Sequence, residues 1–424
     1  MTVRSDWEFR GIFHQVTDES LFTQLDSGGV TVYAGFDPTA PSLHMGNLLQ
    51  IVNLRRLQNA GNRPIALAGG GTGLIGDPSH KATERRLMTH DQLAENLRQI
   101  EAQLARYLDF SPSAGVSQAV LLDNAEWLTA LSLTDFLRDT GKHFTVNQMV
   151  AKESVKSRLD RPDVGISYTE FTYMLLQAYD FLHLYQQHNC TVQIGGSDQW
   201  GNITMGVELV RKVTGGQAYG LTTPLMLKSD GTKFGKSESG AIYLDPQMTS
   251  PFAMYQFLLN SDDADVGKLL RFFTFLSHDE ISELDEKTTS APHERAAQRA
   301  LAHAVTSFVH SEADAVAAAN AGRALFSEDI DTLDEAMLVE AMSDAPSSDV
   351  ARSEVAAGIE IVDLLVRTSL ATSRGEARRF VDQGGVYVNN RKMDGDVVSS
   401  QHLLHDRYIV VRRGRRQTHL IRVA

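Results

Sequence analysis

The sequence Val30-Thr-Val-Tyr-Ala-Gly-Phe36 is a short apolar run with β-branched residues and predicts a buried strand. The polar loop Asp37-Pro-Thr-Ala-Pro-Ser42 follows, and apolar residues then recur at helical spacing from Leu43 to Ala60. Pro64-Ile-Ala-Leu-Ala68 predicts a second buried strand. A strand, a helix and a strand in this order predict a parallel sheet, which binds ligands at the carboxyl ends of its strands.

The alternation of strands and helices continues along the first half of the chain. Short apolar runs at 120–122 and 191–194 predict two more strands. Helical patterns cover 91–108, 132–140 and 171–187. We therefore expect a Rossmann-like α/β domain over residues 1–222, followed by a polar loop segment over 223–248.

The rest of the chain has a different character. Residues 249–341 are rich in Ala, Leu, Glu and Asp at helical spacing and predict an α-helical domain. Residues 342–357 begin with a polar, Ser-containing stretch and predict a linker. Residues 358–424 predict a small α+β domain, with helices at 361–366 and 373–383 and strands at 386–388 and 408–411.

Composition excludes several classes of protein. The chain has 424 residues and a single cysteine, Cys190, so it can form no internal disulfide. We expect a cytoplasmic protein, because no signal-peptide core and no apolar run long enough to span a membrane is present. The net charge is −13, yet residues 358–424 carry 12 Lys and Arg against 7 Asp and Glu. This basic end suggests a polyanionic partner, although a solvated basic surface has the same composition.

The segment from Asp37 to Asn47 follows a strand and opens a helix. A helix N-terminus suits phosphate, because it presents unpaired N–H groups and a positive dipole end. Thr39 and His44 could donate to a phosphoryl oxygen, and Gly46 would let a flat base approach the backbone. The alternative is an ordinary helix cap with His44 on the surface.

The run Lys233-Phe-Gly-Lys-Ser237 lies in a polar loop. Two lysines, a glycine and hydroxyl groups on such a loop can fold over a triphosphate. The spacing of the glycines and the lack of a preceding strand exclude a P-loop. A basic surface hairpin is the alternative.

A glycine-rich run follows the second strand. Gly71 to Gly76 spells the dinucleotide fingerprint G-x-G-x-x-G, but Pro78 would break the helix that the fingerprint requires. A turn that places Asp77 in a cleft fits better, and Asp77 could bind an ammonium group. Lys81 and Arg85 beyond it could reach pyrophosphate.

Two further segments place polar residues at the expected ligand edge. Tyr173, Gln177 and Asp180 share one face of a mostly apolar helix, which favours a polar ligand site over a solvated face. Gln193-Ile-Gly-Gly-Ser-Asp-Gln-Trp-Gly-Asn202 follows a strand, and Asp198 there suits ribose hydroxyls. A plain strand-to-helix turn is the alternative for the second segment.

Together these motifs resemble the bacterial tyrosyl-tRNA synthetases, a family of class I aminoacyl-tRNA synthetases, from about Val32 to Ala424. His44-Met-Gly-Asn47 is similar to the signature His-Ile-Gly-His, and Lys233-Phe-Gly-Lys-Ser237 is similar to Lys-Met-Ser-Lys-Ser. Asn47, Phe234 and Gly235 depart from these patterns. Residues 358–424 resemble a small RNA-binding domain shared with a ribosomal small-subunit protein.

The resemblance implies a tyrosine–tRNA ligase that makes tyrosyl-adenylate and pyrophosphate from L-tyrosine and ATP and then charges tRNA(Tyr). It implies Mg²⁺ bound with ATP, no tightly bound cofactor, no protein metal site, no membrane and a homodimer with an interface near Phe144 to Met149. The residues implied to stabilise the reacting phosphates are His44, Thr39, Lys81, Arg85, Lys233 and Lys236.

The resemblance also assigns the binding residues. It implies that Tyr33 and Asp180 bind the phenolic hydroxyl of tyrosine. It implies that Asp77, Tyr173 and Gln177 bind the ammonium group and that Gln199 binds the carboxylate. The residues implied to bind ATP are Gly35, Asp37, His44, Gly46, Asn47, Gly196, Asp198, Lys233, Lys236 and Ser237. Those expected to contact RNA phosphates are Arg374, Arg378, Arg379, Arg391 and Lys392.

Three other functions compete with this hypothesis. A tryptophanyl-tRNA synthetase would share the fold and both signatures, but Tyr33 with Asp180 is a donor–acceptor pair that suits a phenol. An RNA-binding protein without catalytic activity is disfavoured by the retained His44, Asp77 and signature lysines. A dehydrogenase rests only on the glycine fingerprint.

Overall fold

The computed structural model describes residues 2–77, 88–159, 165–229, 231–232, 234–237, 240–325, 327–343, 345–393, 395–414 and 417–424. The chain divides into two compact units. The first unit comprises Met1–Ser250 and Phe257–His310, and the second comprises Pro251–Gln256 and Ser311–Ala424.

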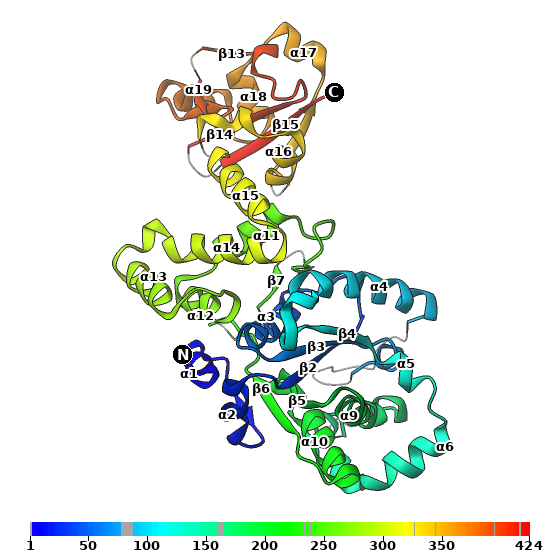
Figure 1. Ribbon diagram of the computed structural model, residues 1–424. Coiled ribbons are helices and arrows are strands. Elements are labelled where there is room, and N and C mark those ends of the chain that lie inside the picture. The colour runs from blue at the N-terminus through cyan, green and yellow to red at the C-terminus, as the bar shows by residue number, and fades with distance from the viewer. Residues whose placement is uncertain are drawn as a thin grey trace. The chain divides into compact units, whose positions relative to one another are not determined.

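A six-stranded sheet forms the centre of the first unit, in the order β1-β6-β5-β2-β3-β4 (Figure 1). The strands β2 to β6 are parallel, and the two-residue β1 pairs antiparallel with β6. Their bounds are β1 (Gln15–Val16), β2 (Thr31–Phe36), β3 (Arg63–Ala68), β4 (Val120–Asp123), β5 (Cys190–Gly196) and β6 (Tyr219–Thr223). The parallel sheet expected from the sequence is confirmed.

The strand order changes direction between β2 and β5. The chain runs outward from β2 through β3 to β4, then returns to β5 on the other side of β2 and continues to β6. The loops that leave β2 and β5 therefore diverge, and a crevice opens at the carboxyl ends of these two strands.

Long helices cover both faces of this sheet, with α3 and α4 on one face and α9 and α10 on the other (Figure 1). Their bounds are α3 (Met45–Asn59), α4 (His90–Tyr107), α9 (Tyr168–His188) and α10 (Trp200–Thr214). The sheet strands are buried on both sides, which explains their continuous apolar runs. The core includes Tyr33, Ile65, Leu67, Phe181 and Met205.

Shorter elements complete the first unit. They are α1 (Val3–Arg10), α2 (Ser20–Ser27), η1 (Thr72–Leu74), η2 (Pro112–Ser117), α5 (Ala125–Leu128), α6 (Leu133–Asp135), η3 (Phe136–Thr140), η4 (Gly141–His143), α7 (Val146–Val150), α8 (Glu153–Leu159), η5 (Ser197–Gln199), β7 (Lys236–Ser237) and β8 (Gly240–Ala241). The single helix expected at 132–140 is a short α-turn followed by a π-turn.

The helical region expected over 249–341 is present. It consists of α11 (Pro251–Leu259), α12 (Asp263–Phe273), α13 (His278–Ser290), η6 (Pro292–Glu294), α14 (Ala296–Val309), α15 (Glu312–Ala324), η7 (Glu328–Thr332) and α16 (Glu335–Ala341). The division into compact units separates α12 to α14, which belong to the first unit, from α15 to α16 in the second.

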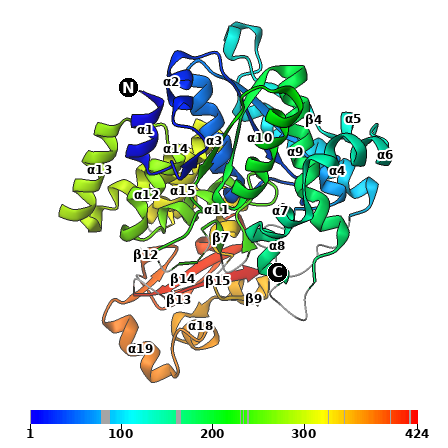
Figure 2. The ribbon, with the colours of Figure 1, turned by 90° about the horizontal axis from the view of Figure 1, so that it is seen from below.

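A five-stranded sheet organises the second unit, in the order β12-β11-β14-β15-β9. Figure 2 shows its strands from below. The strands are β9 (Ser347–Val350), β11 (Val386–Val388), β12 (Arg391–Lys392), β14 (Tyr408–Arg413) and β15 (Gln417–Val423), and β10 (Ile359–Glu360) pairs separately with β13 (Val397–Val398). The helices are α17 (Arg352–Ala357), α18 (Ile361–Arg367), α19 (Arg374–Asp382) and the short η8 (Ser400–His402).

The prediction of a linker over 342–357 is wrong. Ser347–Val350 pairs with β15 as a parallel edge strand, and Val350 and Val355 are buried in the core of the second unit. The polar residues of this strand hid it from the sequence, because main-chain hydrogen bonds to β15 rather than an apolar pattern hold it in place.

Polar contacts attach the small sheet to the segment that precedes it. The Asn390 amide donates to the carbonyls of Leu325 and Ser327, both at 2.8 Å. Arg391 pairs with Asp331 at 3.0 Å. The second unit is therefore one packed body from α15 onward. No helix in the described part of the chain is both long enough and apolar enough to cross a membrane.

Candidate active site

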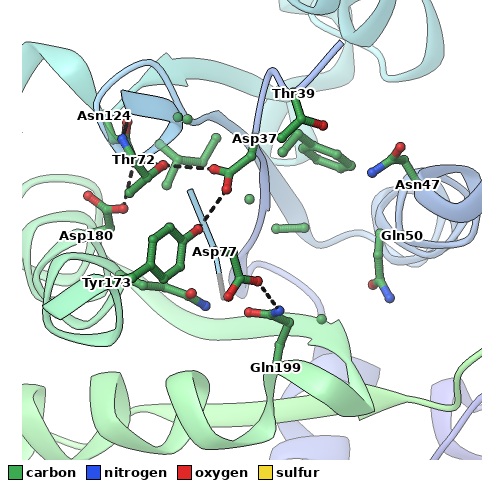
Figure 3. A pocket seen from close by; sticks show the side chains of 18 of the residues that line it. Asp37, Thr39, Asn47, Gln50, Thr72, Asp77, Asn124, Tyr173, Asp180 and Gln199 are labelled. Atoms are coloured by element: carbon green, nitrogen blue, oxygen red, sulfur yellow. Dashed lines mark hydrogen bonds between the residues drawn. The ribbon is translucent and has the colours of Figure 1, made fainter. Parts of the chain in front are cut away.

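A cavity of about 620 Å³ opens at the carboxyl ends of β2, β3 and β5 (Figure 3). Most of the side chains implied by the sequence meet there. The cavity is lined by Tyr33, Gly35, Asp37, Thr39, His44, Asn47, Asp77, Tyr173, Gln177, Asp180, Gly196, Asp198 and Gln199, among others. The change of strand direction thus gathers residues that lie far apart in the sequence.

The deep end of the cavity is built around Asp180. Its carboxylate accepts two hydrogen bonds, from the Trp127 indole Nε1 at 2.7 Å and from the Asn124 amide Nδ2 at 2.9 Å. Asp180 is 2 % exposed, and burial raises the pKa of its carboxyl to about 8, although both hydrogen bonds act in the opposite direction. This end presents a fixed carboxyl in an apolar surrounding.

Tyr33 lines the same cavity and is 1 % exposed. Its hydroxyl has no hydrogen-bond partner among the residues that the structure describes. An unpaired buried hydroxyl is costly, so a ligand that hydrogen-bonds it gains a correspondingly large advantage. Tyr33 and Asp180 together fit a ligand hydroxyl that both donates and accepts.

A second group of acceptors lies along the cavity wall. Tyr173 Oη donates to Asp37 Oδ2 at 2.9 Å, and Thr72 Oγ1 donates to Asp37 Oδ1 at 2.9 Å. Because the Tyr173 proton is used in this bond, its oxygen remains available as an acceptor. Figure 3 shows these side chains together with Asp77. Such a group suits an ammonium ion.

Gln177 and Gln199 are held by neighbours. Gln177 Oε1 accepts from Asn202 Nδ2 at 3.0 Å, while Gln199 Nε2 donates to Asp77 Oδ2 at 2.7 Å. The second N–H of Gln199 Nε2 could still donate to a substrate carboxylate, as the family resemblance implied. In this structure Gln199 orients Asp77.

The nucleotide-facing side of the cavity begins at His44, the N-cap of α3. His44 Nδ1 accepts from the Gly46 N–H at 3.0 Å, and Asn47 Oδ1 accepts from the His44 N–H at 3.1 Å. With Nδ1 as acceptor, the proton of a neutral ring sits on Nε2. Asn47 thus serves as a capping residue, which explains how the helix start tolerates it.

Gly46 is required by the ring of His44. A Cβ at position 46 would lie 2.7 Å from His44 Cε1. The sequence suggests that Gly46 lets a flat base approach the backbone, and the structure shows that the ring of His44 also needs this space. Any side chain here would displace that histidine.

The two signature segments lie against each other in the first unit. The Met45 N–H donates to the Ile242 carbonyl at 2.9 Å, and the Ile242 N–H donates to the Gly235 carbonyl at 3.0 Å. Gly235 has φ +89°, and a Cβ there would lie 2.9 Å from Met45 Cβ. Phe234 is buried against Phe257 and Phe273. These contacts place the second signature beside the helix start of the first.

Several predicted residues cannot be placed in full. Lys81, Arg85 and Lys233 lie outside the described residues. Lys236 and Ser237 form β7, but only their backbone is described.

Sequence reasoning missed Thr72, Asn124, Trp127 and Gln193. Asn124 directly follows β4, so its place at the carboxyl edge of the sheet was available as a signal. Gln193 is 3 % exposed, and its Oε1 has no partner within the described part of the chain. Trp127 carries no comparable signal, because its role depends on the distant Asp180.

The basic candidates of the second unit differ in their surroundings. Arg374 pairs with Asp363 and, at 2.8 Å, with Glu360, while Arg391 pairs with Asp331. All five side chains are exposed, but among the described residues no ion pair is found for Arg378, Arg379 or Lys392. These three are therefore the better candidates to meet phosphates.

The glycine run does not form a dinucleotide-binding turn. Thr72–Leu74 is a short 3₁₀ turn, and Gly76 has φ +84° just before Asp77. The backbone therefore turns at Asp77 where the fingerprint needs a continuing helix.

Comparison with known proteins agrees with this geometry. Residues 26–327 match the family described as tRNA synthetases class I (W and Y), so the chain has the fold of a class I tRNA synthetase. Residues 338–421 match the family described as Tyrosine--tRNA ligase SYY-like C-terminal domain.

Individual relatives show which class I tRNA synthetases the chain resembles. A tyrosine–tRNA ligase of Roseiflexus castenholzii is 51 % identical, over 100 % of this chain and 99 % of its own length. One of Opitutus terrae is 48 % identical over the whole of both chains. A solved structure of a C-terminally truncated mitochondrial tyrosyl-tRNA synthetase from Aspergillus nidulans has a TM-score of 0.68 at 33 % identity, covering 77 % of this chain and 94 % of that one. The chain belongs to the tyrosine–tRNA ligase family.

Proposed function

We propose that this chain activates L-tyrosine with ATP and then transfers the tyrosyl group to the 3′ end of tRNA(Tyr). The observation that carries the proposal is that Tyr33 and Asp180 both line the buried end of the cavity, whose other side begins at His44 and the start of α3. Family membership supplies the reaction class. The pocket supplies the choice of amino acid.

The tyrosine side chain would enter toward Asp180. Its phenolic hydroxyl would donate to the Asp180 carboxylate and accept from the Tyr33 hydroxyl. An indole N–H can donate to Asp180 but leaves the Tyr33 hydroxyl unpaired. Phenylalanine also leaves the Tyr33 hydroxyl unpaired and adds no hydrogen bond to Asp180. The pocket therefore favours tyrosine over both analogues through the cost of unpaired buried groups.

The ammonium of tyrosine would be held by Asp77, the Tyr173 oxygen and Gln177 Oε1. Its carboxylate is already an anion, so attack on the α-phosphate of ATP needs no general base. The new bond joins a carboxylate oxygen to the α-phosphorus, and pyrophosphate leaves. The protein's task is to hold two anions together and to stabilise the charge that grows on the phosphates.

Cationic and hydrogen-bond donors would provide that stabilisation. His44 presents Nε2–H beside the helix start, and Thr39 lines the same cavity. Lys81, Arg85, Lys233 and Lys236 would reach the phosphates, and Mg²⁺ would enter bound to ATP. The ribose would lie over Gly35, Gly196 and Asp198, with Gly46, Asn47, Asp37 and Ser237 completing the nucleotide site.

We also propose a homodimer. Exposed apolar side chains occur along the segment between residues 133 and 168: Leu133 is 71 % exposed, Val146 64 % and Tyr168 71 %. Apolar side chains that are exposed in one subunit can be covered by a second copy. In the stretch from Phe144 to Met149, where the interface was expected, Phe144 and Met149 are buried in the core of the first unit and Val146 is exposed, so Val146 is the residue of this stretch that we propose for the interface.

In the second unit, Arg378, Arg379 and Lys392 are proposed to contact tRNA phosphates, while Arg374 and Arg391 would first have to leave their carboxylate partners.

The test of the proposed function is charging of unfractionated bacterial tRNA with each labelled amino acid. Tyrosine alone should be transferred. Charging with tryptophan, or none at all, would overturn the proposal.

A further inference from the structure

The helix that carries Tyr173, Gln177 and Asp180 continues for two more turns. His183 lies three residues after Asp180 on α9, so the two side chains share one face of the helix. Its imidazole stacks on the Trp127 indole, with ring centroids 4.2 Å apart and planes 15° from parallel. The same indole donates Nε1–H to Asp180 Oδ1 at 2.7 Å. Trp127 therefore contacts His183 through the face of its ring and Asp180 through the N–H at its edge.

The helix that carries Trp127 depends on its surroundings for stability. Trp127 sits on α5, which has only four residues and whose N-cap Asn124 makes no side-chain cap hydrogen bond. Helices this short gain little stability of their own and depend on tertiary packing. The orientation of the indole is thus set by its packing in the core of the first unit and by the stack of the His183 ring parallel to it.

We infer that His183 is a positioning residue for tyrosine recognition: its ring holds the Trp127 indole in the orientation in which the indole N–H bonds Asp180. The inference rests on the proposed function, because it assigns Asp180 to the phenolic hydroxyl. His183 itself touches no substrate. It acts through Trp127.

The charge of His183 follows from its neighbours. Burial and the nearby His188 on the same helix both lower the pKa of the His183 imidazole, so the ring is neutral at neutral pH. From the other elements packed here, Trp127 faces it from α5. Glu126 of α5 and Arg63 of β3 act on His188. Acidification therefore places an imidazolium directly on the indole face.

Steady-state kinetics of His183 variants can distinguish a positioning role of His183 from a role in packing alone. His183→Ala should raise KM for tyrosine in ATP–pyrophosphate exchange by about 2- to 10-fold, the value of one aromatic pair, and leave KM for ATP unchanged. His183→Phe keeps a flat ring and should restore KM for tyrosine. The rate with phenylalanine should not respond to either change, because that substrate has no hydroxyl for Asp180. His188→Gln is the matched control on the same helix.

A spectroscopic readout does not depend on catalysis. A protonated imidazole stacked on an indole quenches its emission, so tryptophan fluorescence of the wild type and of His188→Gln should fall on acidification while the fold persists. His183→Phe should lack this transition. The measurement uses the wild type and a ring-conserving variant, so it stays informative if His183→Ala does not fold.

The outcomes distinguish the inference from the proposed function. If the wild type shows no exchange with tyrosine, the proposed function fails. If the wild type exchanges normally but His183→Ala leaves KM for tyrosine unchanged, or raises KM for tyrosine and ATP equally, the positioning role is overturned. A fluorescence transition that survives in His183→Phe overturns it independently.

Discussion

The side-chain amide of Asn124 donates to Asp180 Oδ2 at 2.9 Å while its own oxygen accepts from the Gly71 N–H at 2.8 Å. One residue thus ties the glycine-rich turn to the carboxyl that is proposed to read the substrate hydroxyl. The bond from Gly71 fixes which way the amide points, because it requires the oxygen on that side.

Asn124→Ala removes a hydrogen bond from each end of this link. KM for tyrosine in pyrophosphate exchange should rise about 10-fold, the usual cost of leaving a buried carboxyl short of a donor. KM for ATP should stay unchanged. An equal rise in both constants would show that Asn124 supports the whole cavity rather than Asp180.

Tyr33→Phe removes the buried hydroxyl that is proposed to donate to the phenol. The value of kcat/KM for tyrosine should fall about 10-fold, while that for phenylalanine should stay level or rise. Parallel exchange assays with the two amino acids give the ratio directly. An equal fall of kcat/KM with tyrosine and with phenylalanine would show that Tyr33 contributes only to packing.

The stability of the fold should depend on pH through Asp180. The folded pKa of this carboxyl is about 8, against an ordinary value of 3.8, so its contribution to stability is complete below the lower value and is lost as pH rises through the higher. Asp180→Asn cannot ionise. The Tm of the variant minus that of the wild type should therefore increase between about pH 5 and about pH 9. A difference that stays constant or falls would contradict the raised pKa.

Gly46→Ala places a Cβ against the His44 ring. Exchange should slow by at least about 10-fold with a raised KM for ATP and an unchanged KM for tyrosine, because only the phosphate-facing group moves. Gly375 is the matched control: it occupies the same second position of a helix, α19, but a Cβ there meets only Ser373 Oγ at 4.0 Å. Gly375→Ala should exchange like the wild type, and comparable losses in both variants would refute the role assigned to Gly46.

Arg378→Gln combined with Arg379→Gln should reduce charging of tRNA and leave pyrophosphate exchange intact. Each lost phosphate contact should also flatten the dependence of log affinity on log salt by about one unit. Arg323→Gln, which changes a single exposed arginine on α15, serves as the control. If exchange falls with charging, the division of labour between the two units is wrong.

Much of the fold was predictable because local patterns carry it. Apolar periodicity predicts the strand at 30–36, the helix after it and the strand at 64–68. The structure confirms all three as β2, α3 and β3. The strand β9 was not predictable, because its polar Ser347-Ser-Asp sequence pairs through backbone bonds with a strand more than 60 residues later. Register of that kind is set by the assembled sheet.

The site divides in the same way. Asp180, Tyr173 and Gln177 could be found because polar residues at helical spacing interrupt an apolar helix. Trp127 and His183 could not, since a tryptophan and a histidine in such places are ordinary core residues until the fold stacks their rings and brings the indole N–H to Asp180. The role of Gly46 was also hidden, as it depends on the rotamer of His44.

The central claim is that the cavity selects a phenol for adenylation. Its most direct test is exchange of labelled pyrophosphate into ATP by the wild-type chain, with Mg²⁺ and without tRNA, using tyrosine, tryptophan and phenylalanine in parallel. The account predicts rapid exchange with tyrosine and only residual exchange with tryptophan and phenylalanine. Exchange that is faster with tryptophan than with tyrosine would contradict the assignment of Tyr33 and Asp180, and no exchange with any of the three would contradict the proposed catalysis itself.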